Sequence, residues 1–244
     1  MKIKMVGTGS IVAKERSACT LIDNEILVDC GNGTVKTLME QGVNVNDIRV
    51  ILITHFHIDH FYDLPMFIFT KLFGNNDKVT KIYGPLGTEK ICEELFNKTM
   101  IDGDNFQKLK IKSNVEFFEF ERLSAEEILE EYFVNSYVVD HCSKSPVYGY
   151  TIQKDNKIIG LSGDSNYCNN IDEILKTSDI TVLDMNSLKG DNYHMGVDDI
   201  QNICKKYKDK KIIATHMTEQ SRQYAKQIKI ENLTIPNDGD EIEI

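Results

Sequence analysis

Residues 54–60, with the sequence THFHIDH, place four groups that can bind a metal or carry a proton within six residues. These groups are His55, His57, Asp59 and His60. They follow residues 50–53 (VILI), an apolar run that is typical of a buried strand. Three of the six histidines of the chain therefore lie at the end of one predicted strand. Since little else brings four such groups together, the pattern predicts a metal site.

Three further candidate ligands lie in the same setting, just after an apolar strand. They are His141, Asp164 and His216, which follow the predicted strands 135–139, 158–162 and 211–215. Strand ends are rigid and their loops are accessible, so side chains there can be held in a fixed geometry. The sixth histidine, His194, lies in a loop before a predicted helix at 197–207.

The spacing of the first two histidines predicts that they bind one metal ion together. In an extended segment, residues two apart point the same way, so His55 and His57 can face the same ion. His141 is the expected third ligand of this ion. Cys142 follows it directly, but an all-nitrogen and oxygen ligand set is favoured over a direct role for this thiol.

A second ion is predicted from the residues that come as the chain turns into the next helix. Asp59 and His60 can face this ion, with His216 as their partner, and the two oxygens of Asp164 can bridge both ions. Two such ions about 3.5–4 Å apart suit a hydrolase, in which a shared water loses its proton and becomes the nucleophile. The ligand set favours zinc, with manganese or iron as alternatives.

Length and composition indicate an ordinary globular protein. The 244 residues are 41% hydrophobic and 27% charged, and no Pro- or Ser-rich linker divides them, which predicts one domain over residues 1–244. The six cysteines are scattered and are expected to be free thiols. No apolar run is long enough to span a membrane and no signal core precedes the first strand, so we expect a cytoplasmic protein without a membrane partner.

The net charge of −10 does not favour attraction of nucleic acid by the overall field of the protein. The densest basic segment is residues 205–211, with five lysines in seven residues. It is interpreted as a solvated helix end, where lysines are favoured by the helix dipole. A local surface for a polyanion is the alternative.

The predicted order of elements is mixed, with strands in runs and strands alternating with helices. This order favours two mixed sheets with helices outside, a mixed α+β and α/β class. In detail, residues 61–73 are predicted to form a helix interrupted at Pro65, residues 108–112 a strand, and residues 125–132 a short helix or an excursion.

The seven candidate ligands resemble the signature of the metallo-β-lactamase superfamily, which is HxHxDH followed by a distant His, Asp and His. The resemblance covers nearly the whole chain. It implies a four-layer αβ/βα sandwich with the metals at one edge of the two sheets.

Within that superfamily the chain most resembles ribonuclease Z, the endonuclease that trims tRNA 3′ ends. The similar segments are MVGTGS (5–10), KERSACTL (14–21), LVDCGNGTVKTL (27–38), PVYGYTI (146–152), LSGDS (161–165) and YHMGVDDI (193–200). The resemblance implies that Asp29 supports the metal loop and that Asp59 is a general base as well as a ligand. It also implies that His194 protonates the leaving oxygen and that the protein forms a homodimer.

The role of His194 also has a chemical reason of its own, because a phosphodiester hydrolase must stabilise a departing alkoxide. A histidine near the metals that is not itself a ligand can donate that proton. The alternative interpretation is a surface residue that precedes a helix.

The sequence departs from ribonuclease Z in one place. That family carries a long arm that grips tRNA between the third histidine and the bridging aspartate, whereas here only 23 residues separate His141 from Asp164. They are predicted to form one hairpin that turns at residues 155–156. Some superfamily members without the arm cleave small or cyclic phosphodiesters.

The leading hypothesis is therefore a dinuclear metal-dependent phosphodiesterase of ribonuclease Z type, acting on RNA or on a small diester. Ester or lactone hydrolysis on the same metals is a second hypothesis. A non-catalytic binding or scaffold protein is a third, and the complete set of seven ligands argues against it.

Overall fold

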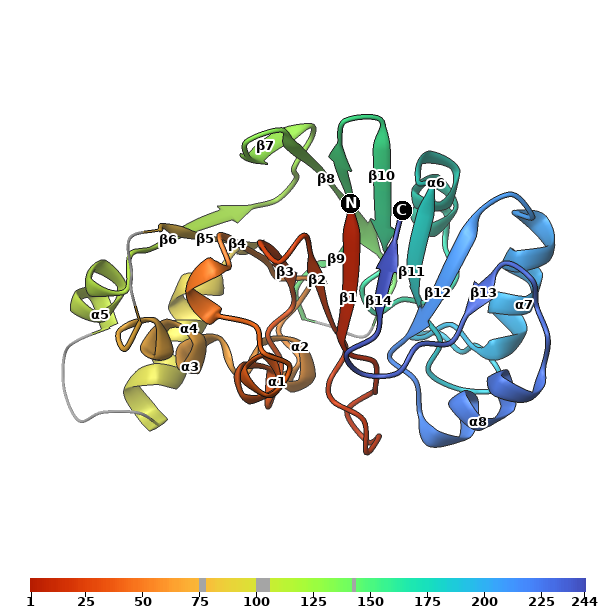
Figure 1. Ribbon diagram of the computed structural model, residues 1–244, viewed down its shortest axis with the longest axis horizontal. Helices are drawn as coiled ribbons and strands as arrows, with labels where there is room; N and C mark the ends of the chain where they lie inside the picture. The colour runs from red at the N-terminus through yellow and green to blue at the C-terminus, as the bar shows by residue number, and fades with distance from the viewer. Residues whose placement is uncertain (75–77, 100–105, 142–143) are drawn as a thin grey trace.

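The computed structural model describes residues 1–74, 78–99, 106–141 and 144–244. In this part of the chain, two seven-stranded sheets pack face to face (Figure 1). The first sheet has the order β14 (Glu241–Glu243), β1 (Lys2–Gly7), β2 (Cys19–Ile22), β3 (Ile26–Val28), β4 (Val50–Leu52), β5 (Thr80–Pro85) and β6 (Val115–Phe120). The second has the order β13 (Leu233–Thr234), β12 (Lys211–Thr215), β11 (Ile180–Asp184), β10 (Lys157–Leu161), β9 (Val147–Lys154), β8 (Tyr132–Val139) and β7 (Glu126–Leu129).

Helices cover the outer face of each sheet, which gives the predicted four layers (Figure 1). The first sheet is covered by α1 (Thr34–Glu40), the short 3-10 helix η1 (Val45–Asp47), α2 (Ile58–Phe61), α3 (Leu64–Lys71), α4 (Thr88–Thr99) and α5 (Phe106–Lys112). The second is covered by α6 (Asn169–Thr177), α7 (Val197–Lys206) and α8 (Glu219–Gln227). The fold class predicted from the sequence is confirmed.

One apolar core lies between the two sheets and is shared by both. Ile3, Ile26 and Leu52 of the first sheet pack there with Tyr150 and Ile159 of the second. The central strands β4 and β11 are buried along their whole length, because each has apolar neighbours on both faces. This explains why β4 is a continuous apolar run in the sequence and why β11 is mostly apolar.

Parallel pairing brings the functional ends of the strands together. β4 is parallel to β3 and β5, and β11 is parallel to β10 and β12, so the carboxyl ends of these strands lie at the same edge of their sheets. A backbone bond from the Tyr148 amide to the Thr54 carbonyl, at 3.1 Å, joins the end of β4 to the second sheet. The predicted ligands therefore meet at an edge formed by both sheets.

Three local predictions were wrong or incomplete. Residues 108–112 belong to helix α5 rather than a strand, because Phe106 and Leu109 lie on one helical face and pack in the outer core. Residues 126–129 form strand β7, which pairs antiparallel with β8, rather than a short helix. Helix α8 was not predicted. The helix expected over residues 61–73, interrupted at Pro65, is found as α3 over residues 64–71, with Pro65 in its first turn, while α2 ends at Phe61.

None of the helices in the described residues has both the length and the apolar character needed to cross a bilayer.

The loop after β3 is fixed by a close approach that only glycine allows. A Cβ on Gly31 would lie 1.8 Å from the backbone oxygen of Asp59, whereas a Cβ on Gly33 would meet no atom within 4 Å. Gly33 has a φ of 82°, so a side chain there would cost backbone strain alone.

We expect Gly31→Ala to lower the free energy of unfolding by about 3 kcal/mol, since the new methyl group overpacks the start of α2. Gly33→Ala is the matched control in the same loop and should cost about 1 kcal/mol from its left-handed backbone. Urea denaturation of both variants measures this difference. Equal losses would show that the contact between the two loops is unimportant.

Candidate metal centre

The structure brings all seven predicted ligands and His194 to one edge of the two sheets. The first sheet supplies the segment after β4, and the second supplies residues that follow β8, β10 and β12 or precede α7. The residues are His55, His57, Asp59, His60, His141, Asp164, His194 and His216. Most of them are buried.

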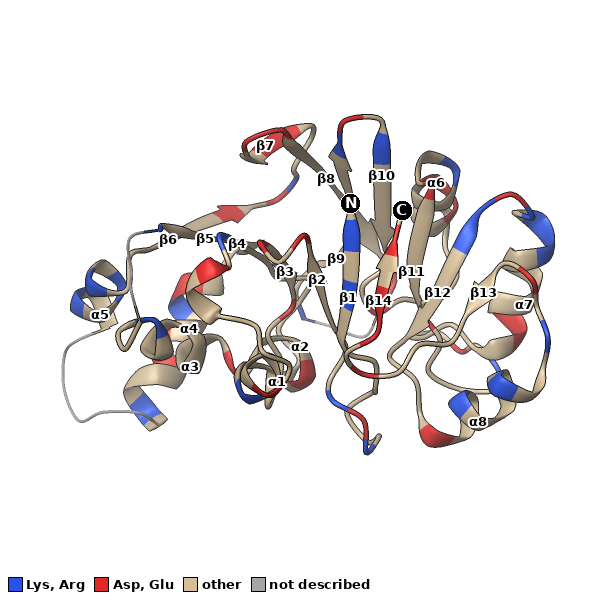
Figure 2. Cartoon of the chain, viewed as in Figure 1, with Lys and Arg blue, Asp and Glu red and all other residues tan. Residues whose placement is uncertain are grey.

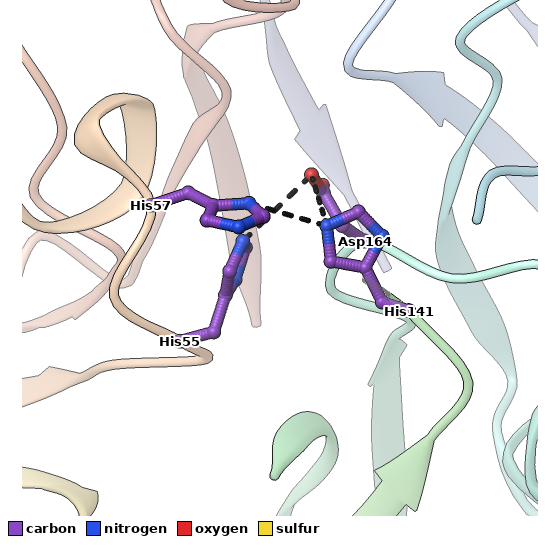
Figure 3. A group of neighbouring side chains, drawn as sticks. All are labelled: His55, His57, His141 and Asp164. Carbon is purple, nitrogen blue, oxygen red and sulfur yellow. Dashed lines mark hydrogen bonds and ion pairs between the residues drawn. The ribbon is translucent and has the colours of Figure 1, made fainter. Parts of the chain in front are cut away.

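The first group consists of His55, His57, His141 and Asp164, whose side chains converge on one point (Figure 3). His57 Nδ1 and His141 Nε2 are 3.2 Å apart. Asp164 Oδ2 lies 3.9 Å from His55 Nε2 and 3.9 Å from His141 Nε2. Three imidazoles and one carboxylate at this spacing form a tetrahedral type of donor set, which suits a divalent transition metal.

The second group consists of Asp59, His60 and His216. Asp59 Oδ2 is 3.1 Å from His216 Nε2 and 3.6 Å from His60 Nε2. Asp164 Oδ2 also faces this group, at 3.2 Å from His60 Nε2 and 3.3 Å from His216 Nε2. Asp164 therefore lies between the two groups, where one carboxylate can serve both.

Hydrogen bonds on the far side of the rings decide which nitrogen faces the centre. His141 Nδ1 lies 2.8 Å from the carbonyl oxygen of Tyr193, so it carries the proton and donates it there. The lone pair of His141 is therefore on Nε2, which faces the other predicted ligands. Such outer hydrogen bonds orient metal-binding histidines and strengthen them as donors.

Asp29 orients two further predicted ligands, His55 and His60, through outer hydrogen bonds. Its carboxylate accepts hydrogen bonds from the Thr54 amide at 2.8 Å, the Thr54 hydroxyl at 2.9 Å and His60 Nδ1 at 2.7 Å. Because the Thr54 hydroxyl donates to Asp29, its oxygen accepts from His55 Nδ1, 2.9 Å away. The Nε2 atoms of both His55 and His60 therefore carry lone pairs that point into the centre.

These lone pairs are the observation that tests whether a metal fits. His55 Nε2 and His60 Nε2 are buried and make no hydrogen bond among the described residues. Burying such unpaired nitrogen atoms costs free energy unless a metal ion binds their lone pairs. Burial lowers the pKa of His55 well below its usual range, so this ring is a neutral donor. The residues therefore fit divalent cations.

Two residues of the centre have a left-handed backbone although they are not glycine. His216 has a φ of 54° and Asp29 a φ of 66°. Such conformations cost energy and persist where the surrounding structure imposes them, which is common at functional sites. The sheet edge imposes them here, since both residues follow buried strands.

His194 lies beside both groups without belonging to the predicted ligands. Its ring is stacked on His216 with centroids 5.2 Å apart, and its centroid is 4.7 Å from that of His141. Nδ1 of His194 is 2.8 Å from Asp184 Oδ2, which leaves Nε2 for a substrate. Burial opposes protonation of the ring, but the hydrogen bond and charge of Asp184 raise the pKa of His194 above its usual value.

Asp184 is the functional residue that sequence reasoning missed. It is fully buried at the end of β11, and its two oxygens face His194 and His216. Only the structure shows that β11 lies between β10 and β12, the strands that precede Asp164 and His216. Cys142, considered for a metal role, lies outside the described residues.

We expect Asp29→Asn to weaken metal binding about 10- to 100-fold, the usual cost of losing an outer-shell partner of a metal ligand. The amide has one acceptor oxygen where the carboxylate accepts three hydrogen bonds, so His60 or Thr54 loses its partner. Competition with a chromogenic chelator measures the affinity.

Asp63→Asn is the matched control, since Asp63 accepts from the Val35 amide and touches none of the predicted ligands. It should bind metal like the unchanged protein. The role given to Asp29 is wrong if both variants have the same affinity.

Comparisons with known proteins identify the family and the fold of the chain. A family model described as Anti-Pycsar protein Apyc1 matches residues 1–236 of the chain. Ribonuclease Z of Prochlorococcus marinus (strain MIT 9312) is 29% identical over 168 residues, which are 64% of this chain and 51% of that relative. The chain thus spans about half the length of the curated relatives that it matches.

Two solved structures share the fold over almost their whole length. The metallo-β-lactamase-fold protein YhfI of Bacillus subtilis has a TM-score of 0.74 at 20% identity, covering 99% of this chain and 98% of that one. The short form of human tRNase Z has a TM-score of 0.74 at 20% identity, covering 100% and 99%. The chain therefore has the metallo-β-lactamase fold and belongs to the family of Anti-Pycsar protein Apyc1.

Proposed function

We propose that this protein is a metal-dependent hydrolase that cleaves phosphodiester bonds on two divalent ions. The observation that carries the proposal is His194, a histidine that lies against both ligand groups and is held by Asp184. A hydrolase of phosphodiesters needs a proton donor for the leaving oxygen, whereas a metal-binding scaffold does not. The names of the relatives, ribonuclease Z and tRNase Z, support the same chemistry, since both names describe cleavage of RNA.

The ligands divide between the ions as the two groups do. His55, His57 and His141 would hold one ion and Asp59, His60 and His216 the other, with Asp164 facing both groups. When bound, the two ions supply Lewis-acid stabilisation of the phosphate oxygens and an acidified water. The nitrogen and oxygen donors favour zinc, with manganese or iron as alternatives.

The remaining steps belong to side chains of the protein. Asp59 lines the cavity above the ligand groups. In addition to its role as a ligand, it acts as the general base that accepts the proton of the attacking water. His194 Nε2 donates a proton to the leaving oxygen. Asp184 keeps the ring of His194 oriented and stabilises its protonated form.

The preferred substrate is a small phosphodiester rather than tRNA. The cavity has a volume of about 490 Å³, a size that is typical of small-molecule sites, and no lysine or arginine is among its described lining residues. Residues 144–164 contain the β9–β10 hairpin, which turns at residues 155–156, in the place of a tRNA-gripping arm. In the part of the chain that the structure describes, lysines and arginines are interspersed with acidic residues along the elements (Figure 2), which does not favour a polynucleotide.

Cleavage of precursor tRNA is the second candidate, supported by the names of the curated relatives. Ester or lactone hydrolysis on the same ions is a weaker candidate, because this reaction has less need of His194 as a proton donor. The lysine cluster at residues 205–211 offers little support for RNA, since Lys206 pairs with Asp172 at 2.6 Å and Lys210 donates to the Ser178 carbonyl at 2.6 Å.

We also propose that residues 1–244 act as one functional domain, since both sheets share one core. The five cysteines among the described residues are free thiols, which supports a reducing compartment such as the cytoplasm. A homodimer is proposed from the resemblance to ribonuclease Z alone.

The first test compares three substrates with metal-loaded protein. We expect hydrolysis of bis(p-nitrophenyl) phosphate, little hydrolysis of a lactone and no cleavage of a precursor tRNA. Absence of diesterase activity with zinc, manganese and iron would contradict the proposed function. Efficient cleavage of the tRNA would select the second candidate instead.

The second test concerns the proton donor. We expect His194→Ala to lower kcat about 10²- to 10⁴-fold for a diester whose leaving group is phenolate, the usual range for loss of a general acid. The loss should be smaller with p-nitrophenolate, which departs without much help. Asn192→Ala, an exposed change in the same loop, should keep the original rates.

Metal affinity is measured alongside these rates, because His194 is assigned no place among the ligands. A fall in kcat that is equal for both leaving groups, or one that follows a loss of metal, would remove the general-acid role from His194.

A further inference from the structure

The cavity above the ligand groups has an apolar rim. Four large apolar side chains line it and remain exposed to solvent by 59%, 80%, 56% and 48%; they are Ile11, Val12, Ile58 and Tyr193. Single exposed apolar residues are ordinary, but several around one cavity mark a binding surface. These apolar side chains have no role in metal binding or in the proposed reaction, so the rim needs another explanation.

Ile11 and Val12 lie at the tip of the loop between β1 and β2, which projects beyond the edge of the sheets (Figure 1). The base of this loop is tightly closed by backbone bonds. The Gly9 amide donates to the Arg16 carbonyl at 2.8 Å, and the Ala18 amide donates to the Gly9 carbonyl at 2.9 Å. A Cβ on Gly9 would lie 2.8 Å from the Glu15 carbonyl oxygen, so the two arms of the loop are in close contact.

Residues from the end of the chain hold the same loop in place. The carboxylate of Asp238 accepts from the Thr8 amide at 2.9 Å and from the Arg16 amide at 2.8 Å. The Ser10 amide donates to the carbonyl of Met217, the residue after the predicted ligand His216, at 3.1 Å. The loop is thus tied to the metal centre, and its apolar tip is held in a fixed position rather than folded into the core.

The opposite part of the rim is also tied to the ligands. Ile58 follows His57 directly at the start of α2. The carbonyl of Tyr193 accepts from His141 Nδ1, so this residue is fixed to the first ligand group. The cavity floor is made of histidines and aspartates, and Ser10 and Asn186 are the other polar residues among its described lining. Outside the floor, the surface offered to a substrate is mainly apolar.

We propose that Ile11 and Val12 form a specificity wall, against which the organic substituents of the phosphodiester pack while the phosphate lies on the metal ions. This inference rests on the proposed function and extends it to substrate choice. The wall favours diesters with flat, apolar ring substituents over diesters with small alkyl groups. The occupant is a small ligand, because the wall and the ligand groups line one cavity of about 490 Å³.

The test measures binding, so that it does not depend on turnover. Diphenylphosphinate and dimethylphosphinate carry the same anionic group and have no ester bond to cleave. The first has two phenyl rings where the second has two methyl groups. Isothermal titration of metal-loaded protein should show tighter binding of diphenylphosphinate. In the double variant Ile11→Ser/Val12→Ser we expect this preference to fall about tenfold or more, as for loss of apolar pocket contacts, with dimethylphosphinate unchanged.

Leu86→Ser is the matched control, since Leu86 is 56% exposed but lies outside the cavity lining. It should keep the preference of the unchanged protein. The wall is wrong if the double variant keeps the preference too, or if it weakens both phosphinates equally, which would indicate a disturbed metal centre.

Kinetics on bis(p-nitrophenyl) phosphate then separate this inference from the proposed function. The double variant should raise KM and leave kcat nearly unchanged. Unchanged protein that shows the phosphinate preference but hydrolyses no diester would overturn the proposed function and leave the wall supported.

Discussion

The carboxylate of Asp164 is the constraint on which the rest of the site depends. Its Oδ2 lies within 3.2 to 3.9 Å of the Nε2 atoms of four histidines, and it is almost completely buried. A buried carboxylate needs compensating positive charge, and four inward lone pairs need an acceptor. Divalent cations satisfy both needs at once. Because His55 and His60 follow a strand of the first sheet and Asp164 and His216 follow strands of the second, bound cations would also join the two sheets.

The outer hydrogen bonds explain why so many residues around the ligands are fixed. Asp29 orients the segment after β4, and Asp184 orients His194 in the loop before α7 and His216 after β12. Each carboxylate contacts ligand histidines or the proton donor without being a predicted ligand. The geometry of the centre is therefore set by residues one step removed from it, and these residues come from strand ends that the sheets position.

Much of the site could be predicted from the sequence because its signal is local. HxHxDH lies within six residues, and the later candidates each follow an apolar run that is recognisable as a strand. Asp184 was missed because the sequence does not show that β11 lies between β10 and β12. The same limit applies to the wrong elements. Residues 108–112 (KLKIK) alternate like a strand, and residues 125–132 favour a helix by propensity, but packing and strand pairing decide both in the other direction.

The ligand groups and the loops around them have different roles, the first in the reaction and the second in substrate choice. The buried histidines and aspartates determine which kind of bond is attacked, and they would be the same for RNA and for a small diester. Substrate choice depends on what surrounds them, and here the surroundings are one short hairpin, no described lysine or arginine in the cavity, and a fixed apolar rim. A polynucleotide would bring further phosphates that meet no positive charge at this rim, and desolvating them would be costly. A diester with one phosphate and apolar substituents places its only charge on the metal ions and its rings against Ile11 and Val12, so every part of it has a matching surface.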